Sequence, residues 1–246
     1  MNAKTLDSKV WFVTGASSGF GWALAEHALS RGHRVVATAR SLAALSELAE
    51  RDPARVALAE LDVTQPAQVR RALSVAFERF GRIDVLVNNA GYGLVGAVEE
   101  TSDAELRAAM DAMFFGAVSV TREALPTLRR QKSGTIVQIT SMGGLMSVPG
   151  FGAYCAAKHA LEGLSEALAA ELAPLGIRVL IVEPGAFRTR LFGAAFRRMP
   201  VIEDYAASVG ATRAYSETAP GTEPGDPAKA ARAIADAVDA GAPTLR

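Results

Sequence analysis

Runs of apolar residues alternate along the chain with segments in which apolar side chains recur every three to four positions. The runs are rich in Val and Ile and contain few polar residues, as is typical of parallel strands covered on both faces. Six runs are predicted to be strands, at residues 9–15, 34–40, 56–63, 83–91, 134–141 and 176–185. Because strands and helices alternate strictly, the sequence predicts an α/β fold with a doubly wound parallel sheet flanked by helices on both faces.

The segments between the runs carry signals that start and stop helices. Gly32 follows the first segment, Pro66 falls in the first turn of the third, and Gly81 lies just past its end. Helices are predicted at residues 21–32, 41–52, 65–81, 102–130 and 227–241, with a further long helix that carries Tyr154. The chain has no internal repeat and no clear linker, so residues 1–246 are expected to form a single domain.

Residues 190–226 interrupt the alternation. They are rich in Gly, Pro and polar residues, and a long segment of this kind is commonly a binding loop or a lid. We therefore expect a substrate loop or lid at 190–226. Only residues 242–246 follow the last predicted helix, which is short for a closing strand and raises the question of whether the chain stops before its natural end.

Composition limits the classes of partner. Lys and Arg together number 26, as do Asp and Glu, so the net charge is zero with neutral His and neither nucleic acid nor an anionic membrane is expected as a partner. Cys155 is the only cysteine, which excludes an intrachain disulfide and indicates a reducing compartment, the cytoplasm. The three histidines lack the spacing of metal ligands, and no apolar run is long enough to span a bilayer, so no metal site and no membrane segment are expected.

A glycine-rich turn at residues 14–21, TGASSGFG, joins the first predicted strand to the first predicted helix. Gly15, Gly19 and Gly21 allow a tight turn and let the backbone approach a pyrophosphate, while the helix N-terminus offers unpaired N–H groups. A glycine-rich turn alone is a weak signal. Its position between a strand and a helix predicts a nucleotide site.

Arg40 follows the second predicted strand, after Ala39. A dinucleotide site that selects NAD usually has an acidic residue here for the ribose 2′-hydroxyl. An arginine instead binds a 2′-phosphate through charge-assisted hydrogen bonds. The sequence therefore favours NADP(H) over NAD as the cofactor, although an arginine after a strand is also commonly just solvated.

Tyr154 and Lys158 stand four residues apart in a predicted helix, so both lie on one side of it. On its own, this pair is better explained by a packed tyrosine and a solvated lysine than by chemistry. Cys155 lies beside the tyrosine, but no histidine stands at a spacing that would activate it, and a small buried thiol is its commoner role.

Several motifs, in order and spacing, resemble the short-chain dehydrogenase/reductase family from Val10 to about Leu191. They are the glycine turn, the "LDV" that ends at Val63, the "NNAG" at 88–91, Ser141 thirteen residues before Tyr154, Tyr-x-x-x-Lys, and "PGAFRT" at 184–189. The resemblance implies a Rossmann-type sheet and an NADP-preferring carbonyl reductase or alcohol dehydrogenase. The cofactor contacts that the motifs imply are Gly15, Ser17, Ser18, Gly19, Phe20, Arg40, Asp62, Val63, Asn89, Ala90, Gly91, Tyr154, Lys158, Pro184, Gly185, Phe187 and Thr189.

The resemblance makes Ser141, Tyr154 and Lys158 the catalytic residues. Tyr154 is the acid and base, Ser141 holds the substrate oxygen, and Lys158 binds the nicotinamide ribose. A tyrosine with an ordinary pKa near 10 is a poor acid or base at neutral pH, so we expect the nearby ammonium of Lys158 to lower the pKa of Tyr154.

Met113 departs from the family pattern. Members usually carry an asparagine in the long helix after "NNAG", where it holds a water that links the lysine to solvent. The aligned stretch here is "MFFG", and a thioether is a weak acceptor and no donor. This puts the proton relay in question but not hydride transfer. We expect an active enzyme in which Met113→Asn changes the rate less than tenfold.

The substrate is expected to be a hydrophobic or aromatic ketone, aldehyde or alcohol, because the residues around the motifs are mostly apolar. The predicted pocket residues are Tyr92, Gly143, Leu145, Met146, Pro149, Phe151 and Phe187. By resemblance, the long helices pair between subunits in a homodimer or homotetramer. Two other functions stay open: an epimerase or dehydratase of the same fold, and a non-catalytic NADP-binding sensor.

Overall fold

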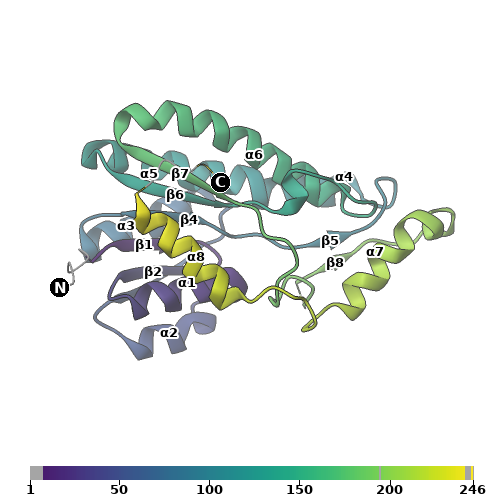
Figure 1. The fold of residues 1–246 in the computed structure, drawn as a ribbon, viewed down its shortest axis with the longest axis horizontal. Helices are drawn as coiled ribbons and strands as arrows, with labels where there is room; N and C mark the ends of the chain where they lie inside the picture. The colour runs from purple at the N-terminus through teal and green to yellow at the C-terminus, as the bar shows by residue number, and fades with distance from the viewer. Residues whose placement is uncertain (1–7, 194, 242–244, 246) are drawn as a thin grey trace.

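The computed structural model describes residues 8–193, 195–241 and 245. Within them, six parallel strands form one sheet in the order β3-β2-β1-β4-β6-β7 (Figure 1). The strands are β1 Val10–Val13, β2 Arg34–Ala39, β3 Val56–Glu60, β4 Val85–Asn88, β6 Gly134–Ile139 and β7 Ile177–Val182. All six lie within the predicted runs, so the α/β fold with a Rossmann-type parallel sheet is confirmed.

The strand order reverses beside β1. The chain first builds β2 and β3 on one side of β1, and then crosses to add β4, β6 and β7 on the other. In open parallel sheets, the carboxyl ends of the strands form a crevice at such a point, and ligands bind there.

Alternate residues of each strand face the two layers of helices. Trp11 and Val13 pack into a cluster with α1 Gly19–Ser30, α2 Ser46–Arg51 and α8 Pro227–Ala240. Val10 and Phe12 pack into a second cluster on the other face. The helices of that second face are α3 Pro66–Phe80, α5 Gly116–Gln131 and α6 Gly152–Leu172.

Two predicted helices differ in the structure. The predicted helix 41–52 is a 3₁₀ turn, Leu42–Leu45, followed by the short α2. The predicted helix 102–130 consists of α4 Asp103–Met110, a π-helical turn Asp111–Phe115, and α5. Apolar spacing continues through the π turn, so the sequence pattern does not reveal it.

The segment 190–226 contains regular structure. β8 Arg197–Arg198 pairs in parallel with β5 Leu94–Val95, which follows β4. A 3₁₀ turn, Glu203–Tyr205, then leads into α7 Ala206–Thr218. Figure 1 shows β5, β8 and α7 together beyond the carboxyl ends of the sheet.

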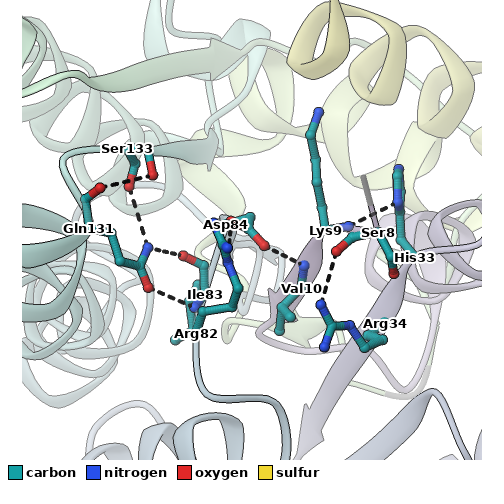
Figure 2. Close-up of polar contacts among 10 residues, drawn as sticks. All are labelled: Ser8, Lys9, Val10, His33, Arg34, Arg82, Ile83, Asp84, Gln131 and Ser133. Carbon is teal, nitrogen blue, oxygen red and sulfur yellow. Dashed lines mark hydrogen bonds and ion pairs between the residues drawn. The ribbon is translucent and has the colours of Figure 1, made fainter. Parts of the chain in front are cut away.

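Side chains tie the strands together at the amino ends of the sheet, opposite the crevice (Figure 2). Asp84 accepts a hydrogen bond from the backbone N–H of Val10 at 2.8 Å and pairs with Arg82 at 2.6 Å. Gln131, at the end of α5, exchanges two hydrogen bonds with the backbone of Ile83, at 3.3 and 2.7 Å. These contacts fix the starts of β1 and β4 relative to α5.

The outer strand β7 meets the end of the chain. The backbone N–H of Ile181 donates to the carbonyl of Leu245 at 2.7 Å, and the Leu245 side chain packs against the core of the sheet. Residues 242–244 and 246, on which the question of a closing strand rests, lie outside the described residues. Of the described helices, none is long and apolar enough to cross a membrane.

Candidate active site

A cavity of about 1250 Å³ lies at the carboxyl ends of the strands. Every cofactor contact expected from the sequence lines it, from Gly15 in the turn after β1 to Thr189 after β7. Of the predicted substrate residues, Tyr92, Gly143, Met146, Phe151 and Phe187 line it too. Leu145 and Pro149 do not: Leu145 is 56% exposed, and the Pro149 carbonyl accepts a hydrogen bond from Thr212. In the loop after Ser141, Met142, Gly143, Met146 and Val148 line the cavity.

The glycine turn has the backbone that its sequence predicts. Gly15 and Gly19 have φ angles of +65° and +56°, in the region that favours glycine. A Cβ on Gly21 would lie 2.4 Å from the carbonyl oxygen of Gly15, so any other residue there would force the turn open. The turn thus passes close to the start of α1, where its backbone can contact a ligand.

The N-terminus of α1 suits an anionic group. Its N-cap Ser18 makes no side-chain capping bond, and no acidic residue stands in the first turn. The N–H groups of this turn and the helix dipole therefore favour a phosphate. Together with the glycine cradle, these observations fit the pyrophosphate of a dinucleotide.

Thr14 and Asn89 bind the glycine turn to the strand β4. The Thr14 hydroxyl accepts from the N–H groups of Asn89 and Ala90 at 2.8 and 3.0 Å. The Asn89 side chain donates to the carbonyls of Thr14 and Gly15 at 2.9 and 3.1 Å. The "NNAG" segment therefore fixes the turn, and both line the same wall of the cavity.

Arg40 lies exposed at the rim of the cavity, near the glycine turn. Among the described residues it has no ion-pair partner. Its guanidinium is thus available to an anion. Asp62, on the same wall, accepts from the N–H and hydroxyl of Thr64 at 2.9 and 2.7 Å, so its side chain is held in place.

Ser141, Tyr154 and Lys158 meet in the middle of the cavity. Ser141 follows β6, its hydroxyl accepts from the N–H of Gly143 at 3.0 Å, and it lies beside the Tyr154 ring at Gly143. Lys158 donates from Nζ to the carbonyl of Ile139 at 2.9 Å, and this Nζ lies 5.7 Å from the centre of the Tyr154 ring. The structure therefore brings together the three residues that the sequence predicts to act together.

The acid–base properties of this group differ from the expectation. Burial raises the pKa of Tyr154, and the nearby Ser141 hydroxyl only partly opposes the rise. The expected lowering by Lys158 is not seen, and its ammonium donates to the Ile139 carbonyl. Burial also lowers the pKa of Lys158 to about 8, although Glu162 opposes this. Tyr154 is thus a protonated acid at neutral pH.

Met113 lies in the π turn between α4 and α5, and its side chain is 1% exposed. Single π turns inside helices are frequent at functional sites. Met113 borders a separate cavity of about 10 Å³ that Asn88 and Lys158 also line. The side-chain oxygen of Asn88 is buried and has no hydrogen-bond partner. A cavity of this size is close to the minimum for one water, and polar atoms line it.

The far end of the cavity is aromatic. Phe151 lies 6.1 Å from the Tyr154 ring and 6.5 Å from Phe196, and Phe192 lies 5.1 Å from Phe196 and 5.7 Å from Tyr215. The sequence predicts a substrate loop here, but Phe192, Phe196 and Tyr215 are not among the predicted pocket residues. The available signal was four aromatic residues, these three and Tyr205, in a segment otherwise rich in small and polar ones.

Comparisons with known proteins agree with this geometry. The family model described as short chain dehydrogenase matches residues 9–217. The protein named Oxidoreductase BOA17, from Botryotinia fuckeliana, is 41% identical over 240 residues, which cover 97% of this chain and 88% of that protein. The chain belongs to the short-chain dehydrogenase family.

Solved structures of other short-chain dehydrogenases have the same fold. One from Streptomyces avermitilis superposes with a TM-score of 0.91 at 49% identity, over 98% of this chain and 88% of that one. One from Burkholderia phymatum, in complex with NAD, superposes with a TM-score of 0.87 at 26% identity, over 99% and 90%. The present short-chain dehydrogenase is thus an oxidoreductase that uses NAD(P).

Proposed function

We propose that this short-chain dehydrogenase interconverts a hydrophobic or aromatic ketone or aldehyde and its alcohol, with NADP(H) as cofactor. The observation that carries the proposal is the placement of Ser141 and Tyr154 side by side at Gly143, in one cavity with the glycine turn and an aromatic end. A carbonyl group bound at this pair would have a proton donor at its oxygen and an apolar surface for the rest of the molecule.

Tyr154 is suited to donate a proton in the reductive direction, because burial keeps its hydroxyl protonated at neutral pH. Ser141 would hold the substrate oxygen beside that hydroxyl. Lys158 would hold the nicotinamide ribose beside Tyr154, since its Nζ lies 5.7 Å from the centre of that ring. When bound, the nicotinamide supplies the hydride for the carbonyl carbon or takes it from the alcohol. In the oxidative direction Tyr154 takes the proton back.

Arg40 supports a preference for NADP(H). Its guanidinium is exposed at the rim of the cavity, near the glycine turn, and has no ion-pair partner among the described residues. The 2′-phosphate of NADP(H) would supply the Arg40 guanidinium with an ion-pair partner.

The apolar lining supports a hydrophobic substrate. Phe151, Phe192 and Phe196 form one side of the far end, and the exposed Met142 and Met146 line the opening. Flexible thioethers and aromatic rings adapt to bulky apolar ligands.

Assembly into a homodimer or homotetramer is also part of the proposal. Leu106 on α4 and Phe115 on the π turn are 39% and 55% exposed, as residues covered by a second subunit would be. Light scattering would measure the molecular mass. The single domain, the cytoplasmic location, and the expected lack of nucleic-acid and membrane partners stay predictions from the sequence.

A substrate panel tests the proposal. Purified protein is mixed with NADPH or NADH and with aromatic and aliphatic ketones and aldehydes, and the nicotinamide absorbance is followed. We expect turnover of apolar aromatic ketones with NADPH, and its loss in Tyr154→Phe and Ser141→Ala. Ser147→Ala, an exposed serine of the same loop that does not line the cavity, should keep full activity. NADPH binding without any turnover would favour a sensor, and conversion without net change of cofactor would favour an epimerase or dehydratase.

A further inference from the structure

A short segment after β7 forms the outer wall of the aromatic end. We call residues 195–219 the cap; it contains β8, the 3₁₀ turn and α7. Phe196, Ala211, Thr212 and Tyr215 of the cap line the cavity. The position of α7 therefore sets the width of the space left for a substrate.

We infer that Glu100 and Arg213 are positioning residues that hold the cap against the body of the enzyme and so set the size of substrate that the cavity accepts. The inference rests on the function proposed above. Neither side chain lines the cavity, so both would act through α7.

Glu100 joins three parts of the chain. Glu100 is only 7% exposed. Its Oε2 accepts hydrogen bonds from the N–H of Ala97 at 2.5 Å and from the Arg213 guanidinium at 2.6 Å. Its Oε1 accepts from the N–H of Ile202 at 2.8 Å. One carboxylate thus binds the turn after β5, the link between β8 and α7, and α7 itself.

Arg213 completes this junction from the side of the cap. Besides the pair with Glu100, its guanidinium donates to the carbonyls of Met199 and Pro200 at 3.0 and 3.1 Å. Removing either charge leaves the other buried without its partner, which is strongly unfavourable. The cap would then have to move so that water reaches the remaining group.

Three glycines outside the cap lie in close contact with cap side chains. A Cβ on Gly93 would lie 2.7 Å from the Phe196 ring, and one on Gly96 would lie 2.5 Å from the Met199 side chain. Gly150, with a φ of +88°, would bring a Cβ within 2.9 Å of Val209. Such contacts leave no room for small shifts, so the cap fits the body in one position only.

Thr212, the residue before Arg213, lines the cavity. Thr212 donates from its hydroxyl to the carbonyl of Pro149 at 2.8 Å, and Tyr215 lies two residues beyond Arg213, against Phe192. From Phe192 the rings continue through Phe196 and Phe151 to Tyr154. A displacement of α7 would therefore alter the wall that holds the bulky part of a substrate, but not Ser141 or Lys158.

The test compares a bulky and a small ketone, 2-acetylnaphthalene and 2-butanone, in wild type and in Arg213→Met. We expect the KM for the bulky ketone to rise about ten- to a hundredfold, as for other displacements of substrate-positioning groups. The kcat for both ketones, the KM for the small one and the Kd for NADPH should stay within about twofold. Arg213→Lys keeps the charge and should restore part of the selectivity.

Arg51→Met is the matched control, since Arg51 pairs with Glu26 and Glu47 on the surface, away from the cavity. It should change neither KM. An equal loss with both ketones, or a parallel loss of NADPH affinity, in Arg213→Met would overturn the inference and leave a purely structural ion pair. Should Arg213→Met fail to fold, the isosteric Glu100→Gln gives the same comparison.

Hydrogen exchange separates a failure of this inference from a failure of the proposed function. If wild type reduces no ketone, the function is wrong, but the role of the junction is still measurable. Amides of α7 should exchange faster in Glu100→Gln than in wild type, while those of α6 keep their rates. Unchanged exchange in α7 would overturn the inference whatever the substrate.

Discussion

The two edges of the sheet use polar side chains in opposite ways. At the amino edge, Asp84 and Gln131 direct their hydrogen bonds to backbone groups of the adjoining strands and to Arg82 (Figure 2). At the carboxyl edge, Arg40 has no ion-pair partner among the described residues, and the ammonium of Lys158 is buried against a single carbonyl. Groups of the first kind stabilise the fold, whereas we propose that those of the second kind bind a ligand.

This contrast predicts that substitutions at the two edges change different quantities. Changes at the carboxyl edge should alter turnover or cofactor choice. They should leave the free energy of unfolding nearly unchanged or raise it. Changes at the amino edge should lower the free energy of unfolding and leave the kinetics intact.

Lys158→Met should have the largest effect. We expect kcat/KM for ketone reduction to fall about 10²- to 10⁴-fold, since the group proposed to position the nicotinamide ribose beside Tyr154 is lost. The free energy of unfolding at pH 7 should rise. The folded pKa of about 8 lies below the ordinary lysine value of 10.5, so burying the charged form destabilises the native state at neutral pH.

The gain in stability should depend on pH with a defined sign. Wild type recovers stability as pH rises from about 8 toward 10.5, because the unfolded chain then binds more protons at Lys158 than the native state does. The difference between variant and wild type should therefore shrink over this window, as urea unfolding at pH 7 and pH 9.5 would measure. A variant that is less stable at pH 7 would contradict the contrast between the edges.

Arg40→Asp should reverse the cofactor preference. An acidic side chain repels a 2′-phosphate and accepts a hydrogen bond from a 2′-hydroxyl, so we expect the ratio of kcat/KM for NADPH over NADH to fall about a hundredfold. The melting temperature should not change, because Arg40 is exposed and has no ion-pair partner among the described residues. An unchanged ratio would remove Arg40 from the cofactor site; Arg40→Lys serves as the charge-preserving control.

Asp84→Ala tests the opposite edge. The N–H of Val10 and the guanidinium of Arg82 would lose their acceptor, so the free energy of unfolding should fall by about 1–3 kcal/mol. The KM for NADPH and for the ketone should match wild type. Asp84→Asn, which keeps an acceptor, should be destabilised less. A rise in either KM in a variant that is fully folded would contradict the contrast between the two edges of the sheet.

Met113→Asn should have the smallest effect, a change in kcat of less than about tenfold. The small cavity beside Lys158 already has polar lining from Asn88, so a proton path there does not depend on a side-chain amide at position 113. Stopped-flow reduction in H₂O and D₂O would measure the step. A larger gain in rate would show that Met113 impairs the relay.

The strands and the centre of the cavity could be predicted because their signals are local. Val- and Ile-rich runs specify the six strands, the glycine turn marks the nucleotide side of the cavity, and the resemblance to the family marks Ser141, Tyr154 and Lys158. Each signal depends on residues near one another in the chain or on a fixed element order.

The remaining features depend on tertiary contacts. The π turn at Met113 keeps helical apolar spacing, so no pattern distinguishes it. The pKa of Tyr154 follows from burial, which a sequence does not display. α7 carries Gly210 in a segment with weak periodicity, and only its docking on Glu100 reveals it as a wall of the cavity.

The ladder between β5 and β8 also bears on the order of folding. It pairs residues 94–95 with 197–198, and the whole of α4, α5, β6, α6 and β7 lies between them in the chain. Closing so long a loop costs more conformational entropy than a two-residue ladder can offset before the sheet exists. We therefore expect the cap to dock late, onto a sheet already formed. The residues expected to contact the dinucleotide all precede the cap, so a folding chain gains the means to hold its cofactor before it gains the means to choose a substrate.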